Sequence, residues 1–419
     1  MRLSIPVNKS GVIAQEYIDI MTLDKEEVVN GLKVFEKTPE IVHIPTKNRD
    51  AVNKLYVDTL FGLSSVTAET YQGAYGLDWN SSTDTYARTG AAGYKAIQSL
   101  MRRCVLNTDG SVKYYLDANN SNYKEDGTLA TLDGTDGNVM VEVQKFYHKY
   151  NYNVATHENS ISLTPDSGYV VHPAFIKDGI EVPTRYYRAY TGYNLAGKII
   201  SRSGVVPTRS LSRTTFRTYA KANGAGWGLT DWNLLYAVQL LLLIELGTFN
   251  SQSILGTGNY LGADYGITTG GTNLLGNNSS MYTVDTYMSY RGIENFYADC
   301  WEWIDGVNVS ERLVYVNNTL ATFADDTYTG DYVSTGVTMP VASGGYISNF
   351  GNSSKGFIAS AVAGSSSTYV TDGLWTTTGS RAVLFGGNVN SGLLAGAFYV
   401  TANDAASSVS VSIGGGVSY

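Results

Sequence analysis

The stretch Cys300-Trp301-Glu302-Trp303-Ile304-Asp305-Gly306 places two tryptophans at alternate positions around a glutamate. Alternate side chains of a β-strand point to the same face, so this pattern predicts a strand that buries Trp301 and Trp303 on one side. Two further carboxylates, Glu294 and Asp299, lie just before the block. A glycosidase would need two carboxylates facing each other across a cleft, whereas helix capping and buried hydrogen bonding require no cleft. We favour the second interpretation, which makes the block structural.

The composition around this block is that of a β-rich protein. The chain has 419 residues, a net charge of −8 and only 16% charged residues, with 45 glycines, 32 tyrosines and 8 prolines. Low charge with abundant Gly and Tyr favours strands and loops with polar, uncharged surfaces, and it argues against a coiled coil or a charge-driven disordered chain. The negative net charge also argues against broad nucleic-acid binding, because phosphates would not be neutralised.

The cysteines and the apolar segments indicate a protein made in a cytoplasm. Cys104 and Cys300 are the only cysteines, and two buried free thiols are favoured over one long-range disulfide. The start, Met1 to Pro6, lacks the apolar segment of a signal peptide. The most apolar run, Leu234 to Leu246, is too short to span a bilayer, so we expect a buried helix and no membrane insertion.

Helix signals are confined to residues 208–250. Ser212 precedes a helix-period run from Arg213 to Asn223, and Asp231 is placed to cap a second helix through Leu246, closed by Gly247. Residues 80–205 and the segment after Asn250 contain short apolar runs separated by Gly, Asp and Ser, which is typical of strands and loops.

The chain contains none of the common catalytic or nucleotide-binding motifs. It has no phosphate-binding Gly-x4-Gly-Lys-Ser/Thr, no His-Glu-x-x-His and no Gly-x-Ser-x-Gly, and its four histidines lack metal-ligand spacing. We therefore expect no cofactor, no metal site and no catalytic residues, and we predict that the protein is not an enzyme.

Several blocks of the sequence, taken in order, resemble one known family. Tyr290 to Asn295 followed by the tryptophan block resembles the late signature of C-type lectin-like domains of the formylglycine-generating-enzyme type. Arg381 to Asn388 and Ser412 to Gly415 are similar to the strands that follow it, and Arg213 to Ala220 and Asp136 to Glu142 are similar to the earlier blocks. The resemblance covers roughly residues 135–419. It implies an α+β fold: two helices on a twisted, mostly antiparallel sheet with long loops, preceded by a small N-terminal β-rich anchoring region.

Within that family the chain looks most like bacteriophage and prophage virion proteins, including the variable receptor-binding proteins of diversity-generating retroelements. The stretch from Phe385 to Phe398 resembles their variable region. Two departures stand out: Gly415-Gly416 replaces the usual closing Phe-Arg, and Asn388-Val389 replaces the usual Ser-Trp.

This resemblance implies three regions and a function. We expect residues 1–65 to be a virion-anchoring segment, 66–134 a β-rich connector or intermediate domain, and 135–419 the lectin-like domain. The implied function is that of a phage virion protein, made in the bacterial cytoplasm, that acts as a receptor-binding or tail-fibre-tip protein for host attachment. The alternatives are a structural virion component of the same fold, such as a head fibre, collar or tail decoration, and, less favoured, a glycan-degrading enzyme.

The implied partners are a host cell-surface glycan or protein, other virion proteins through the N-terminal segment, and further copies of the chain, with a homotrimer the first expectation. For the ligand-binding surface we predict exposed aromatic anchors beside adaptable polar residues on a rigid sheet. The predicted residues are Trp375, Phe385, Asn388, Asn390, Ser391, Phe398, Tyr399 and Asn403. The alternative is an ordinary glycine-rich β core, in which Phe385 and Phe398 point inward.

Overall fold

The computed structural model describes residues 2–9, 12–19, 73–90, 95–262, 265–282 and 286–419. The chain divides into two compact units, Met1–Thr67 and Ala68–Tyr419. In the first unit, β1 (Arg2–Lys9) and β2 (Val12–Asp19) form an antiparallel hairpin. The predicted anchoring segment otherwise lies outside the described residues, and the predicted boundaries after residues 65 and 134 stay predictions.

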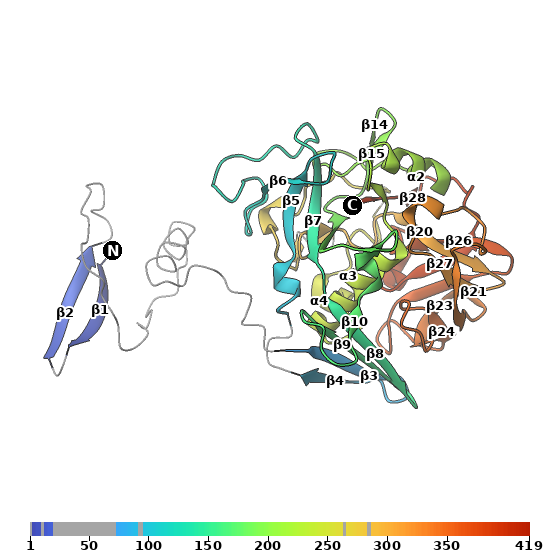
Figure 1. Ribbon diagram of the computed structural model, residues 1–419, viewed down its shortest axis with the longest axis horizontal. Helices are drawn as coiled ribbons and strands as arrows, with labels where there is room; N and C mark the ends of the chain where they lie inside the picture. The colour runs from blue at the N-terminus through green and yellow to red at the C-terminus, as the bar shows by residue number, and fades with distance from the viewer. Residues whose placement is uncertain (1, 10–11, 20–72, 91–94, 263–264, 283–285) are drawn as a thin grey trace. The chain divides into compact units, whose positions relative to one another are not determined.

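Two sheets of the second unit are built mainly from its first half (Figure 1). The five-stranded sheet has the order β10 (Val170–Val171), β8 (Tyr147–Asn153), β9 (Thr156–Ser162), β3 (Tyr75–Asn80) and β4 (Thr85–Gly90). The six-stranded sheet has the order β16 (Gly228–Leu229), β29 (Val417–Ser418), β13 (Thr184–Arg188), β7 (Asn138–Gln144), β5 (Arg102–Leu106) and β6 (Val112–Tyr115). Because β29 is the last strand of the chain, the C-terminal residues lie within a sheet made largely from residues 102–188.

The third sheet has nine strands and comes from the glycine-rich C-terminal part. Its order is β22 (Val333–Thr338), β21 (Leu313–Val316), β20 (Trp301–Ser310), β26 (Ser380–Phe385), β27 (Val400–Asp404), β25 (Gly373–Thr376), β23 (Ala342–Phe350) and β24 (Ala359–Val362), with β28 (Ile413–Gly414) paired to β20. The tryptophan block forms the start of β20, as predicted, and β25 pairs in parallel with β27.

Short pairings connect these sheets. They are β11 (Ile176–Lys177) with β12 (Ile180–Glu181), β14 (Tyr193–Leu195) with β15 (Lys198–Ile200), and β18 (Tyr287–Tyr290) between β17 (Ser280–Tyr282) and β19 (Ile293–Glu294).

The helices begin at the residues that their caps predict. Ser212 accepts a hydrogen bond from the Thr215 amide at the start of α2 (Arg213–Lys221), which ends two residues before the predicted Asn223. Asp231 accepts from the Leu234 amide at the start of α3 (Trp232–Leu246), and Gly247 closes it at φ 75° in the left-handed conformation that glycine tolerates best. A short α4 (Gln252–Leu255) follows.

Helix α3 forms the centre of the hydrophobic core. Its residues from Trp232 to Ile244 are all buried, so it has no polar stripe. The same apolar cluster includes Trp79 of the five-stranded sheet, Val141 of the six-stranded sheet and Val383 of the nine-stranded sheet. A helix that is apolar all round must be buried on every side. This sequence achieves that by surrounding α3 with sheets.

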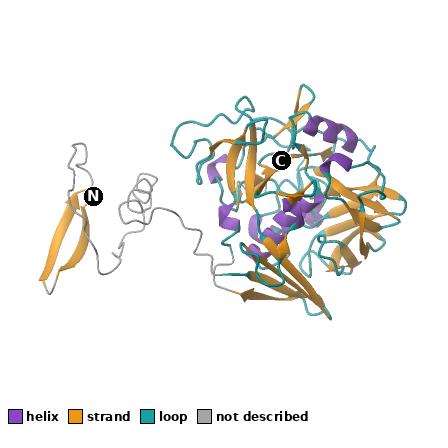
Figure 2. Cartoon of the chain, in the orientation of Figure 1, coloured by secondary structure: helices purple, strands orange, loops and turns teal. Residues whose placement is uncertain are grey.

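The predicted α+β fold class is wrong: the described part of the chain is mostly β. Figure 2 shows that strands and loops make up most of the second unit, and α2, α3 and α4 are the α-helices among the described residues. The helix signals located α2 and α3 correctly. The error lies in the surrounding structure, since the glycine-rich segments form a broad nine-stranded sheet instead of long lectin-type loops on a small sheet. Both cysteines are free and buried, which confirms the expectation for them.

Candidate functional site

The structure separates the eight predicted binding residues by burial. Trp375 is 38% exposed, Asn390 and Asn403 are exposed, and Ser391 is half-buried. Four others are buried, each at 8% exposure or less: Phe385, Asn388, Phe398 and Tyr399. The predicted set therefore does not form one exposed patch.

The two phenylalanines point into the core, Phe385 from the end of β26 and Phe398 from the turn that precedes β27. Phe385 packs on the Phe296 ring at 5.2 Å between centroids, and Phe398 packs edge-on against Phe249 at 4.8 Å. The prediction that these side chains are exposed anchors is corrected: they are core residues, as the alternative interpretation held.

Asn388 and Ser391 stabilise a turn. The Asn388 side-chain oxygen accepts from the Asn390 amide at 2.9 Å, and the Ser391 hydroxyl accepts from the Asn388 amide at 2.9 Å. Asn390 projects outward from this turn and bonds the Tyr265 hydroxyl, so the 388–391 turn is tied to a second loop. Of these residues, Asn390 presents its side chain to solvent.

An aromatic row lies on the face of the nine-stranded sheet that points away from α3; another part of this outer face, with Trp303 and Leu384, is buried in a second apolar cluster. The Trp301 and Tyr399 rings meet at 4.6 Å in an edge-to-face arrangement, although β26 lies between β20 and β27. Gly386, the residue after β26, donates its amide hydrogen bond to the Tyr399 carbonyl at 2.9 Å.

Trp375 continues this row to the molecular surface. A Cβ atom at Gly373 would lie 2.7 Å from Tyr399 Cε2, so the Tyr399 ring occupies space that glycine leaves free. Burial raises the pKa of the Tyr399 hydroxyl, while a hydrogen bond from the Trp375 side chain acts in the opposite direction. We name Trp301, Tyr399 and Trp375 the aromatic row.

Sequence reasoning missed Trp301 as part of a surface. It was predicted to be buried with Trp303, but Trp303 is 0% exposed and Trp301 is half-buried. Both lie on the same side of β20; the difference is that Trp301 is the first residue of the strand. Its position next to the strand end is the sequence signal that could have indicated partial exposure.

The carboxylates of the tryptophan block are engaged in buried bonds. Arg188 of β13 donates to both Glu302 oxygens, one at 2.8 Å, which links the six-stranded to the nine-stranded sheet. Arg217 binds Asp305 in the same bidentate way at 2.6 and 2.8 Å. Asp299 accepts from the Asn259 side chain at 2.8 Å. Burial raises the pKa of Asp299 to about 6. These carboxylates stabilise the fold, in agreement with the interpretation that they serve in buried hydrogen bonds.

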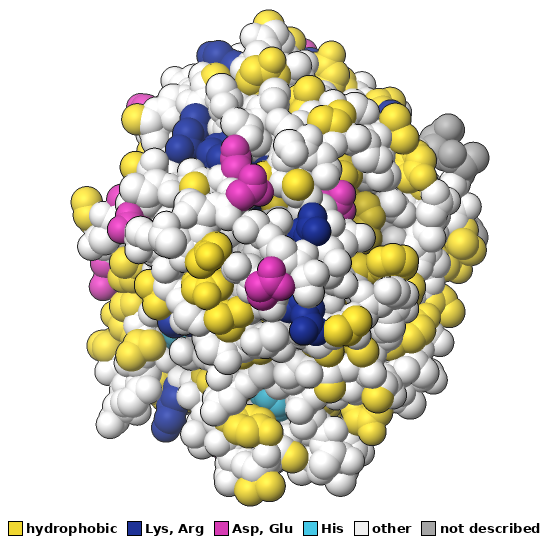
Figure 3. Space-filling model, turned by 90° about the vertical axis from the view of Figure 1, so that its right-hand side faces the viewer, with side chains coloured by type: hydrophobic (Ala, Val, Ile, Leu, Met, Phe, Trp, Pro, Cys, Tyr) yellow, Lys and Arg dark blue, Asp and Glu magenta, His cyan; other side chains and the backbone are white. Residues whose placement is uncertain are grey.

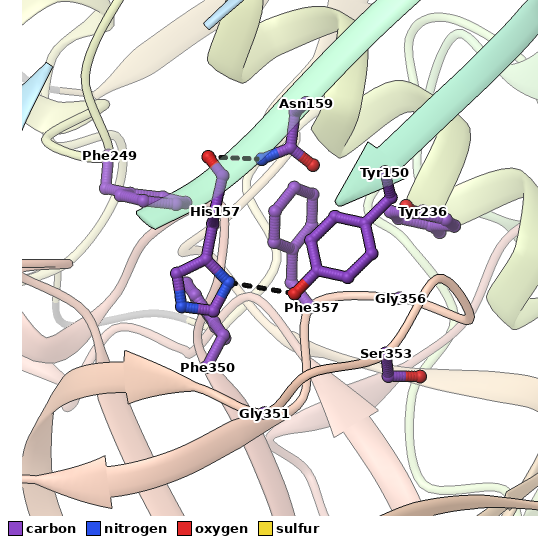
Figure 4. Close-up of a pocket in the computed structure, with 10 residues that line it drawn as sticks. All are labelled: Tyr150, His157, Asn159, Tyr236, Phe249, Phe350, Gly351, Ser353, Gly356 and Phe357. Carbon is purple, nitrogen blue, oxygen red and sulfur yellow. Dashed lines mark hydrogen bonds between the residues drawn. The ribbon is translucent and has the colours of Figure 1, made fainter. Parts of the chain in front are cut away.

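A second candidate is a recess between the β8–β9 hairpin and the segment after β23 (Figure 4). Tyr150 and His157 approach each other there, with Tyr150 Oη 3.0 Å from His157 Nδ1, and His157 Nε2 lies 3.0 Å from Asn349 Oδ1. Aromatic rings fill the recess, and the free space holds about one water molecule. It has no room for an organic ligand.

The surface on the side of β21, β23 and β26 carries few charges. Figure 3 shows scattered Lys, Arg, Asp and Glu side chains there, with hydrophobic side chains in small separate groups between uncharged ones. Within the described residues, no three His, Cys, Asp or Glu side chains are grouped to hold a metal ion. No helix in the same part of the chain has the length and apolarity needed to cross a membrane.

No family model and no curated protein matches this chain. Among solved structures it is similar to one described as "Major Tropism Determinant M1 Variant", with 14% sequence identity and a TM-score of 0.29. The similarity covers 80% of this chain and 75% of that chain, and it is distant.

Proposed function

We propose that this chain is a bacteriophage virion protein that recognises the host cell surface, as a receptor-binding or fibre-tip protein. The observation that carries the proposal is the outer end of the aromatic row. There Trp375 stands 38% exposed on a sheet whose opposite face is core, with Asn403 exposed on the strand beside it. An aromatic anchor with adaptable polar neighbours on a rigid scaffold is the composition that recognition surfaces favour.

Two further points support the proposal. The resemblance of the Phe385–Phe398 stretch to the variable region of phage virion proteins supports a place in the virion. Three carboxylates of the tryptophan block and its approach, Glu302, Asp305 and Asp299, are bonded to Arg188, Arg217 and the Asn259 amide, so this group supports binding in preference to catalysis. Assembly through residues 1–65, formation of a homotrimer, and the absence of nucleic-acid and membrane contacts belong to the same proposal.

The test is competition for adsorption. The full chain, added to host bacteria before the phage, should reduce phage adsorption, and Trp375→Ala should weaken this competition about tenfold or more, the loss expected from one anchor residue. Leu129→Ala is the matched control, because Leu129 is a 72% exposed apolar side chain of another loop. Competition that is absent, or that survives in Trp375→Ala, contradicts the proposed surface.

A structural role in the virion gives a different result. Gold-labelled antibody against the full chain should mark the distal end of the tail or fibre in intact particles. Labelling of the shell or collar, with no competition for adsorption, would favour the alternative of a decoration or head-fibre protein.

A further inference from the structure

The indole of Trp375 is held in one position by its surroundings. All six tryptophans lie within the described residues, and Trp375 is the one that is exposed. A Cβ atom at Gly344 would lie 2.9 Å from Trp375 Nε1 and 3.1 Å from Cε2, so the ring occupies space that only glycine leaves free. Gly344 has φ 85°, which also favours glycine.

Small hydroxyl and amide groups surround this indole. Ser343 is opposite Trp375 on β23 and is exposed, and Thr401 is opposite it on β27. Thr401 Oγ1 donates to Asn403 Oδ1 at 2.6 Å, which fixes the Asn403 amide so that its NH2 group points away from Thr401. The surface thus offers hydroxyl groups and an oriented amide beside a rigid aromatic ring.

We propose that this surface binds a neutral carbohydrate, with one sugar ring stacked on the Trp375 indole and its hydroxyls bonded to Ser343 and Asn403. This inference rests on the proposed function and names the ligand class of the same site. A sugar ring has an apolar C–H face edged by hydroxyls, which matches a flat aromatic ring edged by small polar groups.

Charge and apolar area favour a neutral sugar over an acidic glycan or a protein. No Lys or Arg lies on β23, β25 or β27, all three within the described residues, so these strands themselves offer no cation for a uronate or a phosphate. Trp375 is also the one large apolar side chain that these strands expose. A stable protein interface buries about 800 Å² on each side with a central apolar cluster, whereas a single indole suits one sugar ring.

The first experiment uses an array of neutral hexose, N-acetylhexosamine and 6-deoxyhexose oligosaccharides beside sialylated and uronate ones. The full chain should bind neutral members. Because Trp375 is the exposed tryptophan, titration with a bound neutral oligosaccharide should shift tryptophan emission to shorter wavelength. Trp375→Ala should lose about tenfold or more in affinity and the emission shift, Trp375→Phe should lose less, and Leu129→Ala should match the parent.

A second experiment separates this inference from the proposed function. Host cells are treated with periodate, which destroys sugar rings, or with protease, and binding of the full chain is measured. Loss of binding after periodate supports the carbohydrate. Binding that resists periodate but is lost after protease overturns the carbohydrate and leaves host recognition standing. Array binding to neutral sugars through Trp375 without any cell binding supports the sugar site while the proposed function fails. Array binding to acidic members alone, or to none, overturns the inference.

Discussion

The run Phe398-Tyr399-Val400-Thr401-Ala402-Asn403 divides between the two sides of the nine-stranded sheet. Phe398, Val400 and Ala402 belong to the core cluster around α3, whereas Tyr399 and Asn403 belong to the outer face that leads to solvent. On the inner side, aromatic rings pack at 4.8 to 5.2 Å and charges occur in bonded pairs. On the outer side, the same residue types are spaced by glycines and end in an exposed indole. The comparison shows that residue type alone does not define a binding surface here; strand position does.

The largest effect on stability is expected from breaking a buried ion pair on the inner side of the sheet. Glu302→Ala would leave Arg188, which is fully buried, without its carboxylate. Removing one partner of a buried ion pair costs about 3–5 kcal/mol, so we expect a loss of this size in the free energy of unfolding, measured with urea. Glu181→Ala is the control, since Glu181 forms an exposed pair with Lys145 and should cost about 1 kcal/mol or less. Equal losses in the two variants would contradict the division between core and surface.

A second effect comes from two histidines packed on α3. The rings of His148 and His172 are 4.7 Å apart beside Tyr236, and His148 Nδ1 and His172 Nε2 have no hydrogen-bond partner among the residues that the structure describes. Burial lowers the pKa of His148 to about 4. Burial, with a smaller effect of His148, also holds the pKa of His172 well below 6.5.

The sign of the resulting pH dependence follows from linkage. Below pH 6.5 the two histidines bind protons in the unfolded chain but not in the folded chain. The free energy of unfolding is therefore not reduced by them above pH 6.5, and it decreases as the pH falls toward 4. For His148 alone the expected decrease in the free energy of unfolding is about 3 kcal/mol. Urea unfolding at a series of pH values should show this slope, and His148→Phe should flatten it. A slope that His148→Phe leaves unchanged would assign the acid sensitivity to other groups.

These results bear on how far the sequence predicts the molecule. The caps Ser212 and Asp231 located both main helices because capping is a local interaction. Period-two alternation from Phe398 to Asn403 could likewise have assigned each side chain to a face. The contact of Trp301 with Tyr399 and the pair of Arg188 with Glu302 could not be predicted, because both depend on a strand order that joins residues about a hundred positions apart.

A smaller effect is expected at the 388–391 turn. Asn388 is 8% exposed, and its side chain accepts the Asn390 amide, so Asn388→Ala should cost about 1 kcal/mol by removing a turn-stabilising bond. Differential scanning calorimetry of Asn388→Ala beside Asn388→Asp measures it, because aspartate keeps the accepting oxygen. If Asn388→Ala proves as stable as the parent while adsorption falls, Asn388 contacts the ligand directly and the assignment of the turn as structural is wrong.

The smallest effect on stability is expected at Asn403, on the outer side. Asn403 is exposed, and its bond in the structure is to the neighbouring Thr401 hydroxyl. Asn403→Ala should therefore change the free energy of unfolding by about 0.5 kcal/mol or less. Because the amide is oriented toward solvent beside Trp375, the same substitution should still weaken competition for adsorption. A variant that is destabilised by several kcal/mol would place Asn403 with the core residues of its strand. A variant that is stable and fully competitive would restrict the contact surface to Trp375 and Ser343.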